Sequence, residues 1–227
     1  MTLKVIAFDA DDTLFVNEPY FQETEQKFCG LMSDYLSHQG LSQELFRTEI
    51  ANLDLYGYGI KGYTLSMIEA AMRISNNTIS IEIIERIIEL GKELLQKPIE
   101  LLDGVEETLK ALHGKYKLVV ATKGDLKDQR RKLHDSGLGN FFHHIEVMSD
   151  KQEKDYTDLL KRLEIKPEEF FMIGNSLKSD VLPVLGIGGH AVHIPFHTTW
   201  EHEKISHKVE HPNFRTLEKI SDVLAIL

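Results

Sequence analysis

The amino-acid sequence predicts a three-layer α/β fold, in which helices cover both faces of a parallel sheet. Two observations predict this fold class. Short apolar runs rich in β-forming residues alternate with amphipathic helical stretches in the second half of the chain, and such alternation requires crossover connections between parallel strands. A block of helical texture separates the first apolar run from the others. We therefore expect an α/β core with an inserted all-helical domain.

The first expected strand and the helical block occupy the N-terminal part of the chain. Residues 3–8 form a short apolar run typical of a buried parallel strand, and an acidic cluster follows it. In the next segment apolar residues recur at helical spacing, as in Ile81, Ile84 and Ile88. Because Pro98 disfavours helical geometry in the residue before it, we expect the helical block to end there. The predicted domains are a core of residues 1–16 and 98–227 and a helical insertion of residues 17–97.

Strands and helices alternate in the remainder of the chain. We expect Asp103 to cap the first of these helices, with Glu106 at the capping-box position, and Gly137 to end the second. The expected strands are residues 117–121, 145–148, 169–173 and 191–194. The expected helices are residues 103–113, 125–136 and 155–163, a helical turn through Leu185, and a last helix near residues 216–225.

The composition excludes several classes of protein. The 227 residues carry a net charge of −10 and are 42% hydrophobic, which is too apolar for a disordered chain. The negative charge argues against general affinity for nucleic acid or for an anionic membrane. Cys29 is the single cysteine, so no internal disulfide can form and we expect a reducing compartment. We find no secretion signal and no apolar stretch near the ~20 residues that span a bilayer, and we expect a cytoplasmic protein.

Polar clusters follow the expected strands, at the edge of a parallel sheet where ligands bind. They are Asp9, Asp11 and Thr13 after the first strand, Thr122 and Lys123 after the second, Lys154 after the third, and Asn175 to Asp180 after the fourth. Neighbouring carboxylates repel one another unless a cation lies among them. Oxygen ligands suit Mg²⁺, and a lysine and a threonine suit phosphate oxygens. The clusters therefore predict phosphoryl transfer to a carboxylate nucleophile.

The same clusters resemble the four motifs of the haloacid dehalogenase (HAD) superfamily. Residues 8–13 (Phe-Asp-Ala-Asp-Asp-Thr) are similar to the first motif, hydrophobic-Asp-x-Asp-x-Thr, and residues 119–124 resemble the second, a strand ending in Thr or Ser. Residues 174–180 (Gly-Asn-Ser-Leu-Lys-Ser-Asp) resemble the fourth, usually Gly-Asp-x-x-x-x-Asp, and Lys154 is the candidate for the third-motif lysine. The resemblance implies a HAD-like, three-layer Rossmannoid core whose helical insertion is a C1 cap.

The resemblance further implies a Mg²⁺-dependent phosphatase that acts on a small phosphorylated metabolite. Asp9 would attack phosphorus and form an aspartyl-phosphate, and Asp11 would protonate the leaving alcohol and then deprotonate the attacking water. Thr122 and Lys154 would hold the transferring phosphoryl group, with Lys123 beside them. The implied metal site consists of Asp9, the backbone carbonyl of Asp11, Asn175 and Asp180.

Three positions leave alternatives open. Asn175 stands where the family usually has an acid, and its amide oxygen can ligate Mg²⁺ or a metal-bound water but adds no charge. Lys151 and Lys161 are alternatives to Lys154 as the third-motif lysine. Lys61 lies in a segment rich in glycine and tyrosine, residues 55–63, which we expect either to contact an anionic part of the substrate or to connect two helices.

Other functions remain alternatives to a phosphatase. A phosphomutase would use the same aspartyl-phosphate, and other HAD hydrolase chemistry is conceivable, although haloacid dehalogenases lack the second acid that Asp11 provides. A phospho-acceptor module of the receiver type also combines an acidic cluster, Thr and Lys, but it is shorter and has no cap. A non-catalytic phospho-ligand-binding protein would fit a metal site weakened by Asn175. The histidines between residues 190 and 211 have no spacing that predicts a zinc site.

Overall fold

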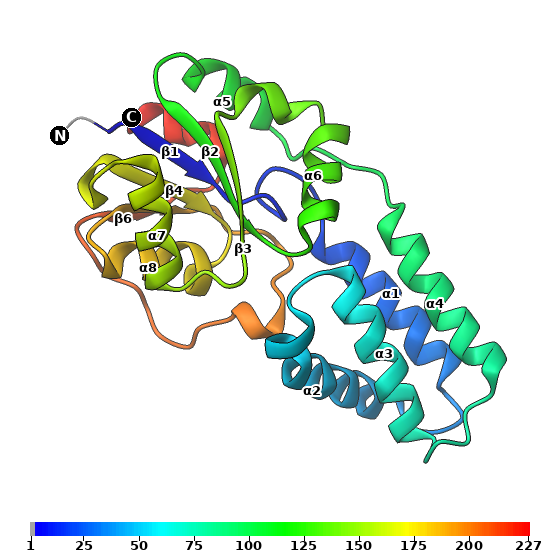
Figure 1. Cartoon of the computed structure of the whole chain (residues 1–227). Coiled ribbons are helices and arrows are strands. Elements are labelled where there is room, and N and C mark those ends of the chain that lie inside the picture. Colours follow the sequence, from blue (N-terminus) through cyan, green and yellow to red (C-terminus); the bar gives the residue numbers. More distant parts are fainter. Residues whose placement is uncertain (1–2) are drawn as a thin grey trace. The chain divides into compact units, whose positions relative to one another are not determined.

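The chain divides into two compact units, which we call the sheet unit and the helical unit (Figure 1). The computed structural model describes residues 3–227. The sheet unit comprises Met1–Glu18 and Ile99–Leu227, and the helical unit comprises Pro19–Pro98. The predicted insertion, residues 17–97, has nearly the same limits as the helical unit.

A six-stranded parallel sheet forms the centre of the sheet unit, with the strand order β3-β2-β1-β4-β5-β6. Every pair of neighbouring strands is parallel, so the predicted α/β class is confirmed. The strands are β1 (Val5–Phe8), β2 (Lys117–Lys123), β3 (His144–Met148), β4 (Phe170–Gly174), β5 (His190–His193) and β6 (Phe214–Thr216).

Successive side chains of the strands pack into two separate cores on opposite faces of the sheet. In β1, Ile6 and Phe8 belong to one core, whereas Val5 and Ala7 belong to the other. This alternation follows from the two-residue period of a strand. Because both faces are covered, all four residues of β1 are fully buried, which accounts for the continuous apolar run in the sequence.

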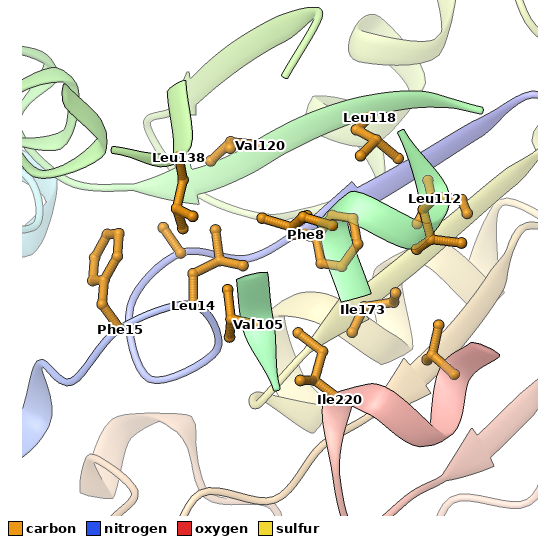
Figure 2. Close-up of a cluster of buried hydrophobic side chains, with 14 of the residues drawn as sticks. Phe8, Leu14, Phe15, Val105, Leu112, Leu118, Val120, Leu138, Ile173 and Ile220 are labelled. Atoms are coloured by element: carbon orange, nitrogen blue, oxygen red, sulfur yellow. The ribbon is translucent and has the colours of Figure 1, made fainter. Parts of the chain in front are cut away.

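Helices on the two faces complete the three layers. The first core, shown in Figure 2, includes residues of α5 (Val105–Leu112), α6 (Leu126–Asp135) and the 3-10 helix η5 (Ile220–Ala225). The second core includes residues of α7 (Glu153–Leu163) and α8 (Leu182–Gly186). The sheet is therefore held rigidly between two apolar layers, which fixes the positions of the loops at its edge.

The strand order reverses between β1 and β4. From β1 the chain crosses to β2 and β3 on one side, whereas β4, β5 and β6 lie on the other. In parallel sheets a crevice opens at such a reversal, outside the carboxyl ends of the strands. Asp9 follows β1 at this edge, and its backbone N–H donates to the carbonyl of Ile173 in β4 at 2.9 Å. The topology thus places Asp9 beside the loop that begins at Asn175.

The C-terminal segment and the start of α5 differ from the sequence prediction. Residues 216–225, expected as a helix, contain the end of β6 and the short helix η5. Since β6 has three residues and pairs only with β5, it lacks the long apolar run that identifies a buried strand. Helix α5 begins at Val105, and its N-cap is Gly104 rather than Asp103. Gly104 has a φ of 79°, a left-handed backbone that favours glycine.

The helical unit consists of four helices around its own apolar core. They are α1 (Glu18–Leu31), whose first residue lies in the sheet unit, α2 (His38–Tyr56), α3 (Ile60–Ile74) and α4 (Ile81–Leu95). The described residues of this unit contain no strand, as predicted. Within residues 3–227, no helix is long and apolar enough to cross a membrane.

The buried face of α4 differs from the stripe that the sequence suggested. Ile81 and Ile88 are 64% and 39% exposed, whereas Ile87, Leu90 and Leu94 are buried in the core of the helical unit. The sequence of α4 carries apolar residues on more than one side. Periodicity alone therefore predicts the helix but does not decide which side packs.

Gly91 of α4 allows a close contact with α3, and we predict that replacing it with alanine destabilises the protein. A Cβ at this position would lie 2.2 Å from Thr64 Oγ1 and 3.1 Å from Thr64 Cβ, so rotation of the threonine cannot relieve the overlap. We expect Gly91→Ala to lower the free energy of unfolding by about 1–3 kcal/mol in urea denaturation. Gly30→Ala is the matched control, because its Cβ would meet nothing within 4 Å on the exposed side of α1. It should raise stability by up to about 1 kcal/mol, and equal gains for both variants would contradict the close contact.

Candidate active site

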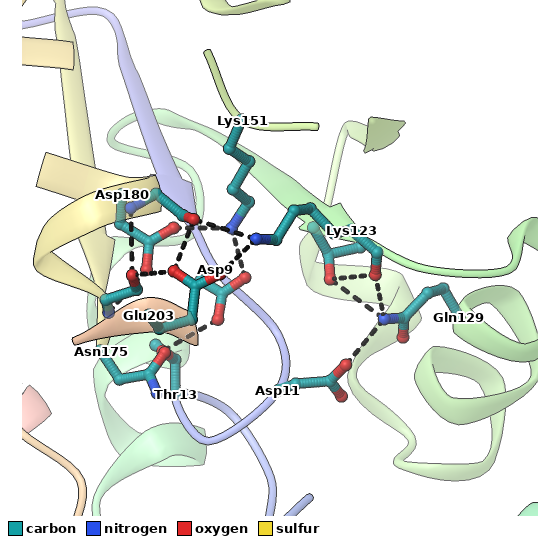
Figure 3. A network of polar contacts seen from close by, with 12 residues as sticks. Asp9, Asp11, Thr13, Lys123, Gln129, Lys151, Asn175, Asp180 and Glu203 are labelled. Atoms are coloured by element: carbon teal, nitrogen blue, oxygen red, sulfur yellow. Dashed lines mark hydrogen bonds and ion pairs between the residues drawn. The ribbon is translucent and has the colours of Figure 1, made fainter. Parts of the chain in front are cut away.

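A buried lysine, Lys151, lies between two buried aspartates in the sheet unit. Its Nζ donates to Asp9 Oδ1 and, at 2.6 Å, to Asp180 Oδ1 (Figure 3). The side chains of Lys151 and Asp180 are 2% and 1% exposed. Burial alone would lower the pKa of Lys151, but the negative charges of Asp180 and Asp9 hold that pKa well above its usual value. The lysine therefore remains cationic and compensates two carboxylates that would otherwise repel each other.

The lysine that contacts Asp9 is Lys151, one of the two alternatives, so the choice of Lys154 as the third-motif lysine is wrong. Lys154 lies in the first turn of α7 and is exposed. Lys161, the other alternative, is exposed and forms an ion pair with Asp158 at 3.0 Å. Lys151 lies in the short loop between β3 and α7, so it is at the edge of the sheet before the helix leads the chain away. The sequence pattern favours the wrong lysine because it predicts the start of α7 at residue 155, whereas the helix begins at Glu153.

Asp9, the first residue after β1, has a buried carboxylate. Burial raises its pKa, Lys151 opposes that effect and the nearby Asp180 adds to it, and together these influences bring the pKa to about 7. Its Oδ2 lies 3.3 Å from the Thr13 hydroxyl, which lies at the same distance from Asn175 Oδ1. Since a hydroxyl has one hydrogen, Thr13 donates to one of these oxygens at a time. The two oxygen atoms therefore flank one hydroxyl group.

A π-helical turn, η3 (Leu177–Val181), brings Asp180 back over the end of β4. The carboxylate Oδ2 of Asp180 accepts the backbone N–H of Ser176 at 2.9 Å. A Cβ on Gly174 would lie 2.2 Å from that oxygen, so this position requires glycine. The Ser176 hydroxyl accepts the N–H of Ser179 at 3.0 Å and so caps this turn.

Asp11, two residues after Asp9, is held by α6. Its two carboxylate oxygens accept from Gln129 Nε2 and Lys132 Nζ, each at 2.8 Å. In Figure 3 the Asp11 side chain points toward Gln129. Thr122 at the end of β2 is 1% exposed, and its hydroxyl accepts from the same Gln129 amide at 3.1 Å. The structure thus places Asp11 and Thr122 next to each other, as expected for residues of one site.

Lys123 is directed toward the loop after β4 rather than into open solvent. Its Nζ donates to Ser179 Oγ at 2.9 Å and forms an ion pair with Glu203. Glu203 also accepts from the hydroxyls of Ser176 and Ser179. Burial would raise the pKa of Glu203, but Lys123 and the two hydroxyls lower it to about 2. Lys123, which we expected beside the phosphoryl group, therefore has an internal anionic partner.

Sequence reasoning missed Gln129, Lys132 and Glu203. The first two lie three residues apart on one face of α6, so buried polar residues on a helix beside the site were the available signal. Glu203 lies in the 3-10 helix η4 (Glu201–Glu203), in an irregular segment after β5, and no local pattern marks it. Lys61 lies in the first turn of α3 and is exposed. Its expected substrate contact stays a prediction.

The oxygen atoms at the end of β1 and β4 have the chemistry that suits Mg²⁺. Asp9, Asp180 and Asn175 contribute carboxylate and amide oxygens, which are hard ligands. Lys151 contacts both carboxylates, and Thr13 lies between Asp9 and Asn175. The three oxygen-bearing side chains that could bind a metal are therefore close together. Among residues 3–227 no three His, Cys, Asp or Glu side chains group in a way that could hold a metal ion. A cation here would therefore depend on amide, backbone or water oxygens besides the two carboxylates.

Comparison with known proteins identifies the class of hydrolase to which this fold and site belong. Residues 3–185 match the family model described as haloacid dehalogenase-like hydrolase. A structure of a haloacid dehalogenase-like family hydrolase from Xanthomonas campestris is 39% identical, with a TM-score of 0.90, covering 99% of this chain and 90% of that one. This chain belongs to the haloacid dehalogenase-like hydrolase family. A search of curated protein sequences gave no significant match.

More distant structures share the fold and include different activities. A predicted phosphoglycolate phosphatase from Haemophilus somnus is 18% identical, with a TM-score of 0.65, covering 100% of this chain and 98% of that one. The putative hydrolase YfnB from Bacillus subtilis, bound to magnesium, is 18% identical, with a TM-score of 0.67, covering 100% of this chain and 99% of that one. Haloacid dehalogenases are also among these neighbours.

The partly buried Glu203 should stabilise the fold in a pH-dependent manner. Because its pKa falls from about 4.5 to about 2 on folding, its contribution is fully present above pH 4.5 and declines as the pH falls toward 2. We expect Glu203→Gln to lower the free energy of unfolding by roughly 2–3 kcal/mol at pH 7. Chemical denaturation at pH 7 and at pH 3.5 should show a smaller difference from the wild type at the lower pH.

The control is Glu201→Gln, which changes an exposed residue of the same short helix and should change stability little at either pH. A pH-independent loss would contradict the charged role of Glu203.

Proposed function

We propose that this hydrolase is a Mg²⁺-dependent phosphatase that removes the phosphoryl group of a small phosphomonoester through an aspartyl-phosphate on Asp9. The observation that carries the proposal is the contact of the buried Asp9 carboxylate with Lys151, with a second acid, Asp11, two residues further along the chain. A carboxylate nucleophile, a cation for the phosphoryl oxygens and a separate acid are the groups that this reaction needs.

The proposed reaction has two steps that use the same residues. In the first step a carboxylate oxygen of Asp9 bonds to phosphorus, the bond between phosphorus and the leaving oxygen breaks, and Asp11 gives that oxygen a proton. In the second step Asp11 takes a proton from water, whose oxygen attacks phosphorus and releases phosphate from Asp9. Lys151 offsets the negative charge of Asp9 as the anionic phosphate approaches. Thr122 lies beside Asp11 and would contact the phosphoryl group.

The metal site of the proposed phosphatase would use Asp9, Asp180, Asn175 and the backbone carbonyl of Asp11. A bound Mg²⁺ would supply positive charge that favours ionised Asp9 and draws electrons from the phosphoryl oxygens. Asn175 keeps an oxygen in place of the usual acid, and its contact with Thr13 orients that amide group. Magnesium in a structural neighbour supports the choice of metal for the fold, at 18% identity.

Hydrolysis of a carbon–halogen bond is the second candidate function. The haloacid dehalogenases among the structural neighbours favour it. We rank it below the phosphatase because the resemblance associates dehalogenation with a single aspartate, whereas this chain keeps Asp11. A phosphomutase would use the same Asp9 chemistry and differ in the fate of the phosphoryl group.

Asp9→Asn should abolish turnover. Because the amide cannot form a stable acyl phosphate, we expect hydrolysis of p-nitrophenyl phosphate with Mg²⁺ to fall by at least about 10³-fold. Asp54→Asn, an exposed site in the helical unit, is the control and should leave the rate unchanged. Turnover that survives in Asp9→Asn or without divalent metal would refute the phosphatase proposal. Release of halide from a 2-haloacid in place of phosphate would support the second candidate.

The two lysines near β3 should respond differently to the same substitution. Lys151→Met removes the cation that contacts Asp9 and Asp180, and we expect kcat/KM to fall by at least about 10²-fold. Lys154→Met removes an exposed charge nearby in the sequence, and kcat/KM should stay within about twofold of the wild type. Circular dichroism of both variants checks that they fold. Similar losses in both variants would show that the charge at Lys151 has no special role.

A further inference from the structure

Asp11 accepts hydrogen bonds from two side chains, one at each oxygen of its carboxylate. Lys132 Nζ donates to Oδ1 and Gln129 Nε2 donates to Oδ2, each at 2.8 Å. Gln129 and Lys132 are 2% and 7% exposed, whereas the side chain of Asp11 itself is 25% exposed. The donors are therefore fixed in the protein interior, and the carboxylate that they hold reaches solvent.

Gln129 has further contacts that fix its amide in one orientation. Its Nε2 also donates to the carbonyl of Lys123 at 2.6 Å and approaches the Thr122 hydroxyl at 3.1 Å. The amide oxygen is buried and has no hydrogen-bond partner among residues 3–227. Exchange of the amide oxygen and nitrogen would direct the oxygen at Asp11 Oδ2 and at the Lys123 carbonyl, both of which are acceptors. The amide therefore links Asp11 to the end of β2 in one arrangement.

Lys132 is held from three directions besides its contact with Asp11. Its Nζ donates to Asn17 Oδ1 at 2.8 Å and lies 5.8 Å from the centre of the Phe15 ring. Asp128, one turn earlier on α6, has a carboxylate oxygen 4.0 Å away. Since a buried ammonium group is costly unless it is paired, this set of contacts keeps Lys132 in place beside Asp11.

We propose that Gln129 and Lys132 are positioning residues that orient the Asp11 carboxylate for proton transfer to the leaving group. The inference rests on the proposed phosphatase function, in which Asp11 protonates the oxygen that leaves phosphorus. Neither residue takes part in bond making. They hold the carboxylate in one rotamer, so that its proton reaches the leaving oxygen rather than solvent.

This role has a consequence that a purely structural role lacks. A leaving group that is already acidic, such as p-nitrophenol, departs without a proton, whereas an alkyl alcohol needs one. Misplacing Asp11 therefore lowers kcat/KM, which reports the step in which the alcohol leaves, for alkyl phosphates and spares kcat/KM for aryl phosphates. The later step, in which Asp11 takes a proton from water, is the same for both substrates and does not enter this comparison. A general disturbance of the site would slow both to the same extent.

The test compares two substrates, glycerol 2-phosphate and p-nitrophenyl phosphate, in Lys132→Met and Gln129→Leu. We expect kcat/KM for glycerol 2-phosphate to fall about 10–100-fold and kcat/KM for p-nitrophenyl phosphate to fall less than about threefold. Lys127→Met and Arg130→Met are the controls, because they remove exposed charges from the same helix and should change neither rate. Lys132→Arg, which keeps the charge, should recover part of the loss.

A second arm tests whether the effect passes through Asp11. With Asp11→Asn in place, adding Lys132→Met should cause no further change in the ratio of the two rates, because the group being positioned is gone. Equal losses on both substrates, or a further change of the ratio with Asp11→Asn in place, would overturn the positioning role. No hydrolysis of either substrate by the wild-type protein would instead reject the phosphatase function, which keeps the two failures distinct.

Discussion

The buried charge cluster of Lys151, Asp9 and Asp180 is the constraint on which the site depends. Each of these residues follows a different strand of the sheet, and none could stay charged in the interior alone. One ammonium group between two carboxylates leaves a net negative charge at the end of β1. A net negative charge at this place suits a divalent cation, which is what the proposed phosphatase would need before an anionic substrate could approach.

The sheet supplies the precision that this cluster needs. β1 is buried on both faces and hydrogen bonded on both edges, so the residue that follows it has little freedom. The close approach of Asp180 to Gly174 depends on a position without a side chain, and the π-helical turn then returns the chain toward β1. The spacing between Gly174 and Asp180 in the fourth motif is therefore set by the backbone geometry of this turn as well as by the chemistry of the site.

Much of the fold could be predicted because its signals are local. The apolar run of residues 3–8, the later strand-helix alternation and the polar residues at strand ends indicated the parallel sheet and the position of Asp9. The choice between Lys151 and Lys154 failed because it depends on where α7 begins, and helix starts are weakly encoded. Glu203 and β6 could not be predicted, since each is defined by contacts with distant segments rather than by its neighbours in the chain.

The position of Glu203 has a consequence for the charge around the second-motif loop. The family match ends at residue 185, whereas the carboxylate that pairs with Lys123 comes from residue 203. The charge beside Lys123 therefore depends on a segment that the four motifs do not include. Substitutions in that segment would change the electrostatic surroundings of the second-motif loop while Asp9, Asp11 and Lys151 stay the same.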